Sequence, residues 1–171
     1  MTNKTFAAML AAFTLALGTA ACSGSGEDVA ETTSPDAPAG ISVTDGRISL
    51  PAVKGNPAAL YFTIRNVSEQ PVTIRAVNVA GTGSAQLHET TELAGRMDMQ
   101  ELVQVPVEPG AEVLFDQGGK HVMAFDLDDD LAPGGETEVT LIFTGGDKVS
   151  FPAKLMAPGS ADMDYSAMEG V

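Results

Sequence analysis

Apolar and polar residues alternate with a period of two through most of the stretch from Ile41 to Leu155, and this period predicts short β-strands instead of helices. The alternation is clearest in five segments, residues 60–65, 72–75, 120–127, 138–143 and 149–151. Turn signals separate these segments, among them Asp45-Gly46, Gly55-Asn56-Pro57, Pro133-Gly134-Gly135 and Gly145-Gly146-Asp147. Short strands at such spacing predict a single all-β domain over residues 41–156, folded as an antiparallel Greek-key β-sandwich.

The pattern also carries two expectations about packing. Pro152 lies inside the last strand pattern, and proline cannot donate to a ladder, so we expect this strand at a sheet edge. In residues 120–127, His121, Met123, Phe125 and Leu127 share one face, because alternate residues of a strand point to the same side. We expect Phe125 and Leu127 to belong to the core, and the His–Met pair to lie where that face reaches one end of the sandwich.

The N-terminal residues have the pattern of an export signal. Lys4 precedes 16 uncharged residues, 6–21, which suit a secretory apolar region but are too few to span a bilayer comfortably. The run Gly18-Thr19-Ala20-Ala21-Cys22 resembles a bacterial lipoprotein signal, in which cleavage leaves a lipidated Cys22. An ordinary secretory signal with an incidental cysteine is the alternative. Both predict an exported, periplasmic or extracytoplasmic protein with residues 1–21 removed, which contacts the membrane only through the lipid if it is anchored.

Composition describes the rest of the chain. Residues 22–40 are rich in Gly, Ser, Pro and acids and predict a flexible linker, and residues 157–171 predict a flexible tail. The formal net charge of −14 excludes a nucleic-acid partner, since such binding depends on Lys and Arg. The single cysteine excludes a disulfide framework and a multi-thiolate metal site within one chain.

The two histidines and two of the methionines form a spaced pattern. His121 and Met123 are adjacent on one strand face, which taken alone is more often a half-buried histidine beside a core methionine. Ten residues separate His88 from Met99, and 21 separate Met99 from His121. Thioethers are soft ligands that select Cu(I), and two imidazoles with two thioethers can surround that ion without a thiolate. These four donors together suit a copper(I) ion.

The spacing His-x10-Met-x21-His-x-Met resembles the signature of the periplasmic PCuAC-type copper(I) chaperones. The resemblance extends over residues 41–155, through the segments 59–66, 109–110, 118–123, 131–135 and 139–143. It implies a cupredoxin-like (Ig-like) sandwich that holds one Cu(I) through His88, Met99, His121 and Met123. It also implies delivery to the copper-A site of cytochrome c oxidase, or to another copper assembly protein. Met97 shares a strand face with Met99 and is an auxiliary candidate.

Other metals fit the sequence less well. A blue-copper centre needs a cysteine ligand, and Cys22 lies outside the domain. The run Asp126-x-Asp128-x-Asp130 begins like a calcium loop, but Leu131 and Thr137 occupy the positions that need Gly and Glu. Methionine is a poor zinc ligand.

Three functions stay open at this point. The leading one is a copper carrier; the second is a copper-sequestering or tolerance protein; the third is a metal-free Ig-like interaction module. An enzyme is not expected, since no nucleophile–base set stands outside the metal pattern. Met163 and Met168 in the tail are either surface methionines or ligands of a further Cu(I) or Cu(II) ion.

Overall fold

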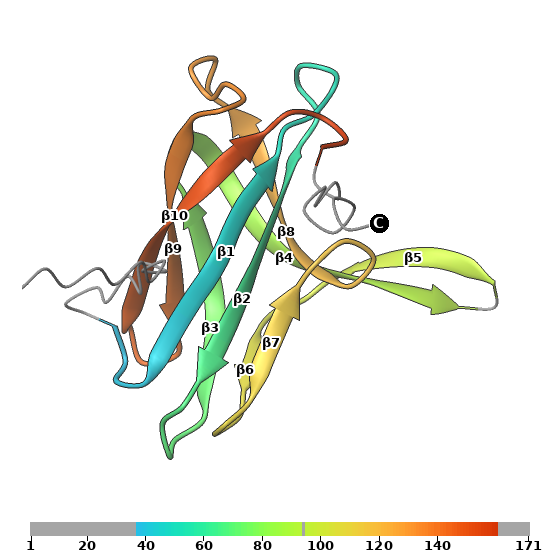
Figure 1. Cartoon of the computed structure of the whole chain (residues 1–171). Coiled ribbons are helices and arrows are strands. Elements are labelled where there is room, and N and C mark those ends of the chain that lie inside the picture. The colour runs from blue at the N-terminus through green and yellow to red at the C-terminus, as the bar shows by residue number, and fades with distance from the viewer. Residues whose placement is uncertain (1–36, 94, 161–171) are drawn as a thin grey trace, which may run out of the picture.

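The computed structural model describes residues 37–93 and 95–160, and within them the fold is all-β. Ten strands follow one another without an intervening helix in this part of the chain (Figure 1). Their bounds are β1 Ile41–Ser49, β2 Ala58–Asn66, β3 Val72–Val79, β4 Thr82–Leu93, β5 Arg96–Glu101, β6 Val105–Val107, β7 Glu112–Phe115, β8 Lys120–Leu127, β9 Glu136–Phe143 and β10 Lys148–Met156. The predicted all-β class is confirmed, and each of the five alternating segments lies within one strand.

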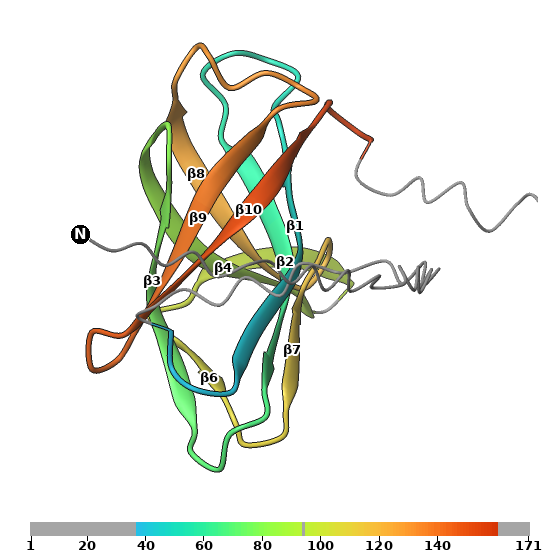
Figure 2. The same ribbon diagram turned by 60° about the vertical axis from the view of Figure 1, so that its left-hand side comes forward.

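The strands join into one hydrogen-bonded sheet that curls around the core (Figure 2). Its order is β5-β4-β8-β7-β2-β1-β10-β9-β3-β6, with a further pairing of β8 to β2. Most neighbours are antiparallel, but β1 pairs with β10, and β7 with β8, in parallel. The expectation of purely antiparallel pairing is therefore wrong at these two places.

The core is filled from nearly every strand. Phe62 of β2 is fully buried and stacks on Phe115 of β7, with ring centroids 4.2 Å apart. Phe151 of β10 packs against the ring of Phe62 in a tilted arrangement, with centroids 5.4 Å apart. Aromatic pairs in these geometries add to the stabilisation from burial alone. These contacts fix the relative positions of β2, β7 and β10, and β2 and β7 both pair with β8, which carries His121.

Two sequence expectations, for Asp45-Gly46 and for Pro152, are wrong because β1 contains a bulge. Asp45-Gly46 is not a turn between strands but a bulge inside β1, where the register against β2 shifts between Thr44 and Arg47. Pro152 lies in β10, which is an interior strand between β1 and β9. The proline is tolerated there because the β1–β10 ladder covers only Arg47 to Ser49, beyond the bulge.

Some predictions fall on residues that the structure does not describe. The signal segment 1–21, Cys22 and most of the linker lie outside the described part, as do Met163 and Met168. Within residues 37–93 and 95–160, no helix is long and apolar enough to cross a membrane.

Candidate metal centre

His88 and His121 face each other across two neighbouring strands. They are direct partners in the antiparallel ladder of β4 and β8, and their ring centroids are 5.9 Å apart. The preceding pair, Leu87 and Val122, is buried and points to the core. Since successive residues of a strand alternate between faces, the two imidazoles project from the opposite face of the sheet.

The predicted packing of β8 is wrong for Phe125. Val122 and Ala124 are the fully buried residues of this strand, whereas Met123 and Phe125, on the face of His121, are half-buried. Both faces of the strand carry apolar residues, so the alternation did not reveal which face was inside. Leu127 does pack against the core, and it follows Asp126, whose φ of 54° marks a change in the strand.

The ring of His121 is held in one tautomer by the backbone. Its side chain is only 5% exposed, and Nδ1 lies 3.0 Å from the carbonyl oxygen of Gly119. A carbonyl only accepts, so Nδ1 carries the proton and donates it. In the neutral ring the lone pair then lies on Nε2, as is usual for a metal-binding imidazole with such a partner.

The two ring nitrogens of His88 have different surroundings. Nε2 lies 3.3 Å from Oε1 of Gln86, to which it can donate, and Nδ1 is buried with no hydrogen bond among the described residues. An unpaired buried nitrogen is costly unless a ligand completes it. Burial lowers the pKa of His88 below 6.5, the neighbouring His121 lowers it further, and Glu101 acts in the opposite direction. This environment favours the neutral imidazole that a metal requires.

The two predicted thioethers project from the same side of the sheet. Met123 is two residues beyond His121 on β8, opposite Gln86 of β4, and is half-buried. Met99 of β5 pairs with Thr90, which is two residues beyond His88 on β4. Cross-strand partners and alternate residues share a face, so strand geometry gathers His88, Met99, His121 and Met123 on one face of β5, β4 and β8.

The β5 side of this face is open to solvent. The β4–β5 hairpin projects away from the body of the sheet (Figure 1). Met99 is 52% exposed and Met97, opposite Glu92, is 64% exposed. Sequence reasoning did not identify Gln86 and Gly119, which contact the two imidazoles, because both contacts depend on the fold.

The acidic run after β8 does not gather into a site. Asp129 forms an ion pair with Lys54, and both side chains are largely exposed. Among the residues that the structure describes, no three His, Cys, Asp or Glu side chains converge as a metal site.

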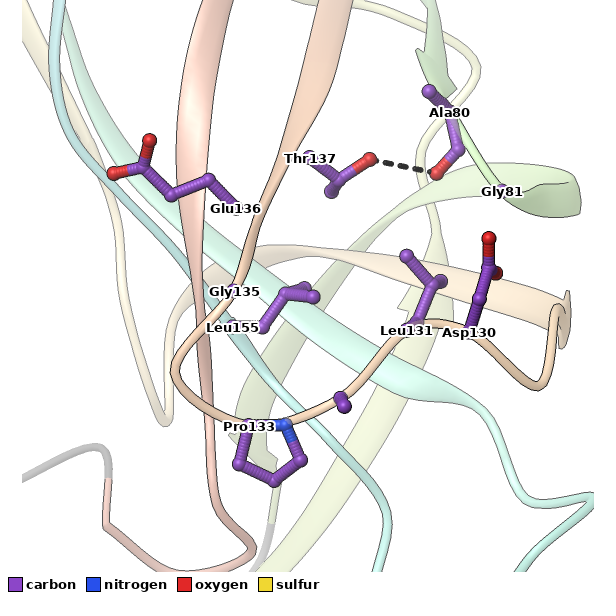
Figure 3. A pocket seen from close by; sticks show the side chains of 10 residues that line it. Ala80, Gly81, Asp130, Leu131, Pro133, Gly135, Glu136, Thr137 and Leu155 are labelled. Carbon is purple, nitrogen blue, oxygen red and sulfur yellow. Dashed lines mark hydrogen bonds between the residues drawn. The ribbon is translucent and has the colours of Figure 1, made fainter.

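A depression of about 370 Å³ lies beside this acidic run, where β8 has ended and β4 begins (Figure 3). Leu131, Pro133 and Leu155 line it, and Thr137 donates a hydrogen bond to the carbonyl of Ala80 at 2.8 Å. It lies toward Leu127 of β8 and Thr82 of β4, whereas the two histidines lie toward the other ends of these strands. The depression is therefore separate from the candidate centre.

Solved structures share this architecture. The copper-bound PCuAC domain from PmoF2 matches with a TM-score of 0.57 at 24% identity, covering 70% of this chain and 94% of that one. The apo PCuAC domain from PmoF1 matches with a TM-score of 0.57 at 26% identity, covering 70% and 95%. Apo-DR1885 from Deinococcus radiodurans matches with a TM-score of 0.51 at 21% identity, covering 90% and 97%. The fold is that of the PCuAC domains, and the predicted cupredoxin-like class is confirmed.

The family follows from the sequence itself. A family model described as "Putative lipoprotein LpqE-like" matches residues 41–155, the whole of the predicted sandwich except its last residue. The chain belongs to this LpqE-like family. No curated protein matches the chain significantly. The resemblance to PCuAC-type proteins drawn from the His and Met spacing is thus confirmed at the level of family and fold.

Proposed function

We propose that this protein is an exported copper(I) carrier that holds one Cu(I) ion between β4, β5 and β8 and passes it to a recipient metalloprotein. His88, Met99, His121 and Met123 are the proposed ligands. One observation carries the proposal: two imidazoles face each other at 5.9 Å, and one has a buried nitrogen that no other described residue hydrogen-bonds. The copper named with the related PmoF2 domain supports the choice of metal.

The chemistry of these donors fits a carrier better than a resident cofactor site. Two neutral nitrogens and two thioethers suit Cu(I), and they bind it less strongly than thiolates would. The exposed position of Met99 leaves one side of the ion accessible to incoming ligands from a partner. An ion held by soft, neutral and partly exposed donors can be transferred by ligand exchange, with no electron transfer and no enzymatic turnover.

Anaerobic titration of the mature full-length chain with Cu(I), in competition with a chromogenic chelator, tests the binding. We expect one equivalent in the wild type and strongly weakened binding in His121→Ala and Met123→Ala. Met156→Leu is a matched control, because Met156 is a half-buried methionine at the end of β10, outside the proposed centre. Uptake of less than one equivalent, with no effect of the two variants, would contradict the proposal.

The proposal includes a recipient and a location. The resemblance to PCuAC proteins supports delivery to the copper-A site of cytochrome c oxidase, and the lipoprotein description of the family supports anchoring through Cys22. Transfer from the loaded protein to an apo copper-A fragment tests the first. Firm binding without transfer would favour copper sequestration instead.

The tail methionines have a separate test. Met163 and Met168 are proposed only as ligands of a further copper ion. Truncation after Ala157 removes both. An unchanged one-to-one stoichiometry and an unchanged affinity after truncation would exclude them as ligands.

A further inference from the structure

A half-buried ion pair joins β1 to the loop that precedes β8. Arg47 donates from a terminal guanidinium nitrogen to Oδ1 of Asp116 at 2.7 Å, across 69 positions of sequence. The two side chains are 26% and 42% exposed, so the pair is partly shielded from water. It lies on the outer face of the sheet, because Arg47 pairs with Tyr61 of β2 while the next pair, Ile48 and Leu60, points to the core.

Packing orients the arginine in this pair. The guanidinium carbon lies 5.2 Å from the ring centroid of Tyr61, which is itself only 8% exposed. A guanidinium over an aromatic face is held by cation–π attraction as well as by its hydrogen bonds. The Nε atom of Arg47 is buried and makes no hydrogen bond among the described residues. Burying this unpaired Nε–H costs free energy, which the ion pair and the cation–π contact offset.

Asp116 is connected through its own backbone to the ring of His121. Its amide donates to the carbonyl of Lys120 at 2.7 Å, and its carbonyl accepts from the amide of Gly119 at 3.1 Å, so residues 116–120 form a closed turn. The carbonyl of Gly119 accepts from Nδ1 of His121 at 3.0 Å and from the amide of Thr90 at 3.0 Å. The group that sets the tautomer of His121 is thus part of the turn that Arg47 holds.

We infer that Arg47 and Asp116 are positioning residues for His121. They fix the Gly119 carbonyl so that Nδ1 of His121 stays protonated and Nε2 stays directed at the proposed ion. The inference rests on the proposed function for its consequence in metal binding, but the positioning itself is a property of the metal-free protein. Outer partners of this kind orient ligands and change metal affinity without touching the ion.

Long-range ¹H–¹⁵N NMR correlations of the histidine rings in the metal-free, full-length chain test the positioning. The wild type should show His121 as the Nδ1–H tautomer. Arg47→Met keeps the apolar stem on Tyr61 but removes the ion pair, and Asp116→Asn removes only the charge. We expect both to introduce the Nε2–H tautomer or exchange broadening at His121, with His88 less affected.

Cu(I) affinity of the same variants supplies the second measurement. We expect a loss of about tenfold in each, the lower end of the range for outer partners. The double variant should lose no more than either single variant, because both act through one pair. Arg47→Lys should restore part of the loss. Lys54→Met is the matched control: it breaks the exposed Lys54–Asp129 ion pair and should change neither measurement.

The outcomes separate this inference from the proposed function. An unchanged His121 tautomer, together with affinity within twofold of the wild type in folded Arg47→Met and Asp116→Asn, would overturn the positioning. If Arg47→Met does not fold, the charge-only Asp116→Asn decides the question. If the wild type binds no Cu(I), the proposed function fails, while the tautomer of the metal-free variants still confirms or refutes the positioning.

Discussion

β8 and β5 contribute to the same face of the sheet but differ in how firmly they are held. β8 pairs with β4 on one side and with β2 on the other, and His121 is almost completely buried. Among the described strands β5 pairs only with β4, and each of its six residues is exposed. Regions with few buried contacts open locally at low free-energy cost. The proposed ion therefore has a fixed side, at His121 and Met123, and a yielding side, at Met99, where the strand is held less firmly.

The fixed side should dominate the affinity. His121→Ala removes a nearly buried proposed ligand whose ring is oriented by a hydrogen bond to the Gly119 carbonyl. We expect the Cu(I) affinity to fall by more than about 100-fold, since outer partners alone are worth 10- to 100-fold. Chelator competition measures this, with circular dichroism to show that the variant is folded. A loss smaller than that of Met99→Leu would invert the comparison of the two sides.

The yielding side should contribute less to affinity and more to release. Met99→Leu preserves size and apolarity while removing the sulfur. We expect an affinity loss of about tenfold, the lower end of the range for outer partners, with a faster transfer of copper to a chelator. Stopped-flow transfer measures the rate. An equal or larger loss than in Met123→Leu would show that the exposed hairpin is as important as β8.

His88 lies on β4, between β5 and β8. It should make the stability of the metal-free protein depend on pH. Burial and the neighbouring His121 lower the pKa of His88 from 6.5, against the opposing effect of Glu101. The folded protein therefore binds fewer protons than the unfolded chain between that lowered pKa and 6.5. Its stability should fall as the pH drops below 6.5 and level off below the lowered pKa.

Urea unfolding of the metal-free chain across this pH range measures the effect, and His88→Gln should flatten the dependence. The same slope in His88→Gln as in the wild type would assign it to other groups. Lys54→Met, remote from His88, should keep the wild-type slope.

The smallest effect is expected at Met97. It is exposed and lies two residues before Met99 on β5, opposite Glu92. We expect Met97→Leu to leave stability and Cu(I) affinity within about twofold, because a lone exposed residue away from buried contacts usually changes little. Titration measures this. A loss comparable to that of Met99→Leu would identify Met97 as a ligand in its own right.

Sequence patterns predicted the strands that turn one face to the core and the other to solvent. β2, β3, β9 and β10 were found because alternating apolar residues line the core. The β4–β5 hairpin was not predicted as an element, since a projecting arm has no inner face and hence no apolar period. Phe125 was misplaced because β8 is apolar on both sides, and Asp45-Gly46 was misinterpreted because a bulge and a turn use the same residues.

The candidate site was predicted only as a set of residues. Spacing and resemblance selected His88, Met99, His121 and Met123, but their placement on one face depends on the register between β4, β5 and β8. Registers between strands 33 residues apart are set by tertiary packing. The connection from Arg47 through Asp116 to His121 was beyond sequence reasoning for the same reason, since it joins β1 to a distant loop.

The bulge in β1 has an evolutionary consequence. Before it, Ile41 and Val43 face the core; after it, Ile48 and Leu50 do, so the inward positions change from odd to even numbers. Gly46 permits this close crossing, because a Cβ there would lie 2.6 Å from the carbonyl of Pro152. A one-residue deletion at this point would exchange the orientations of Arg47 and Ile48. Relatives that lack this residue should therefore also lack the arginine, so the length of β1 and the ion pair to Asp116 should change together among them.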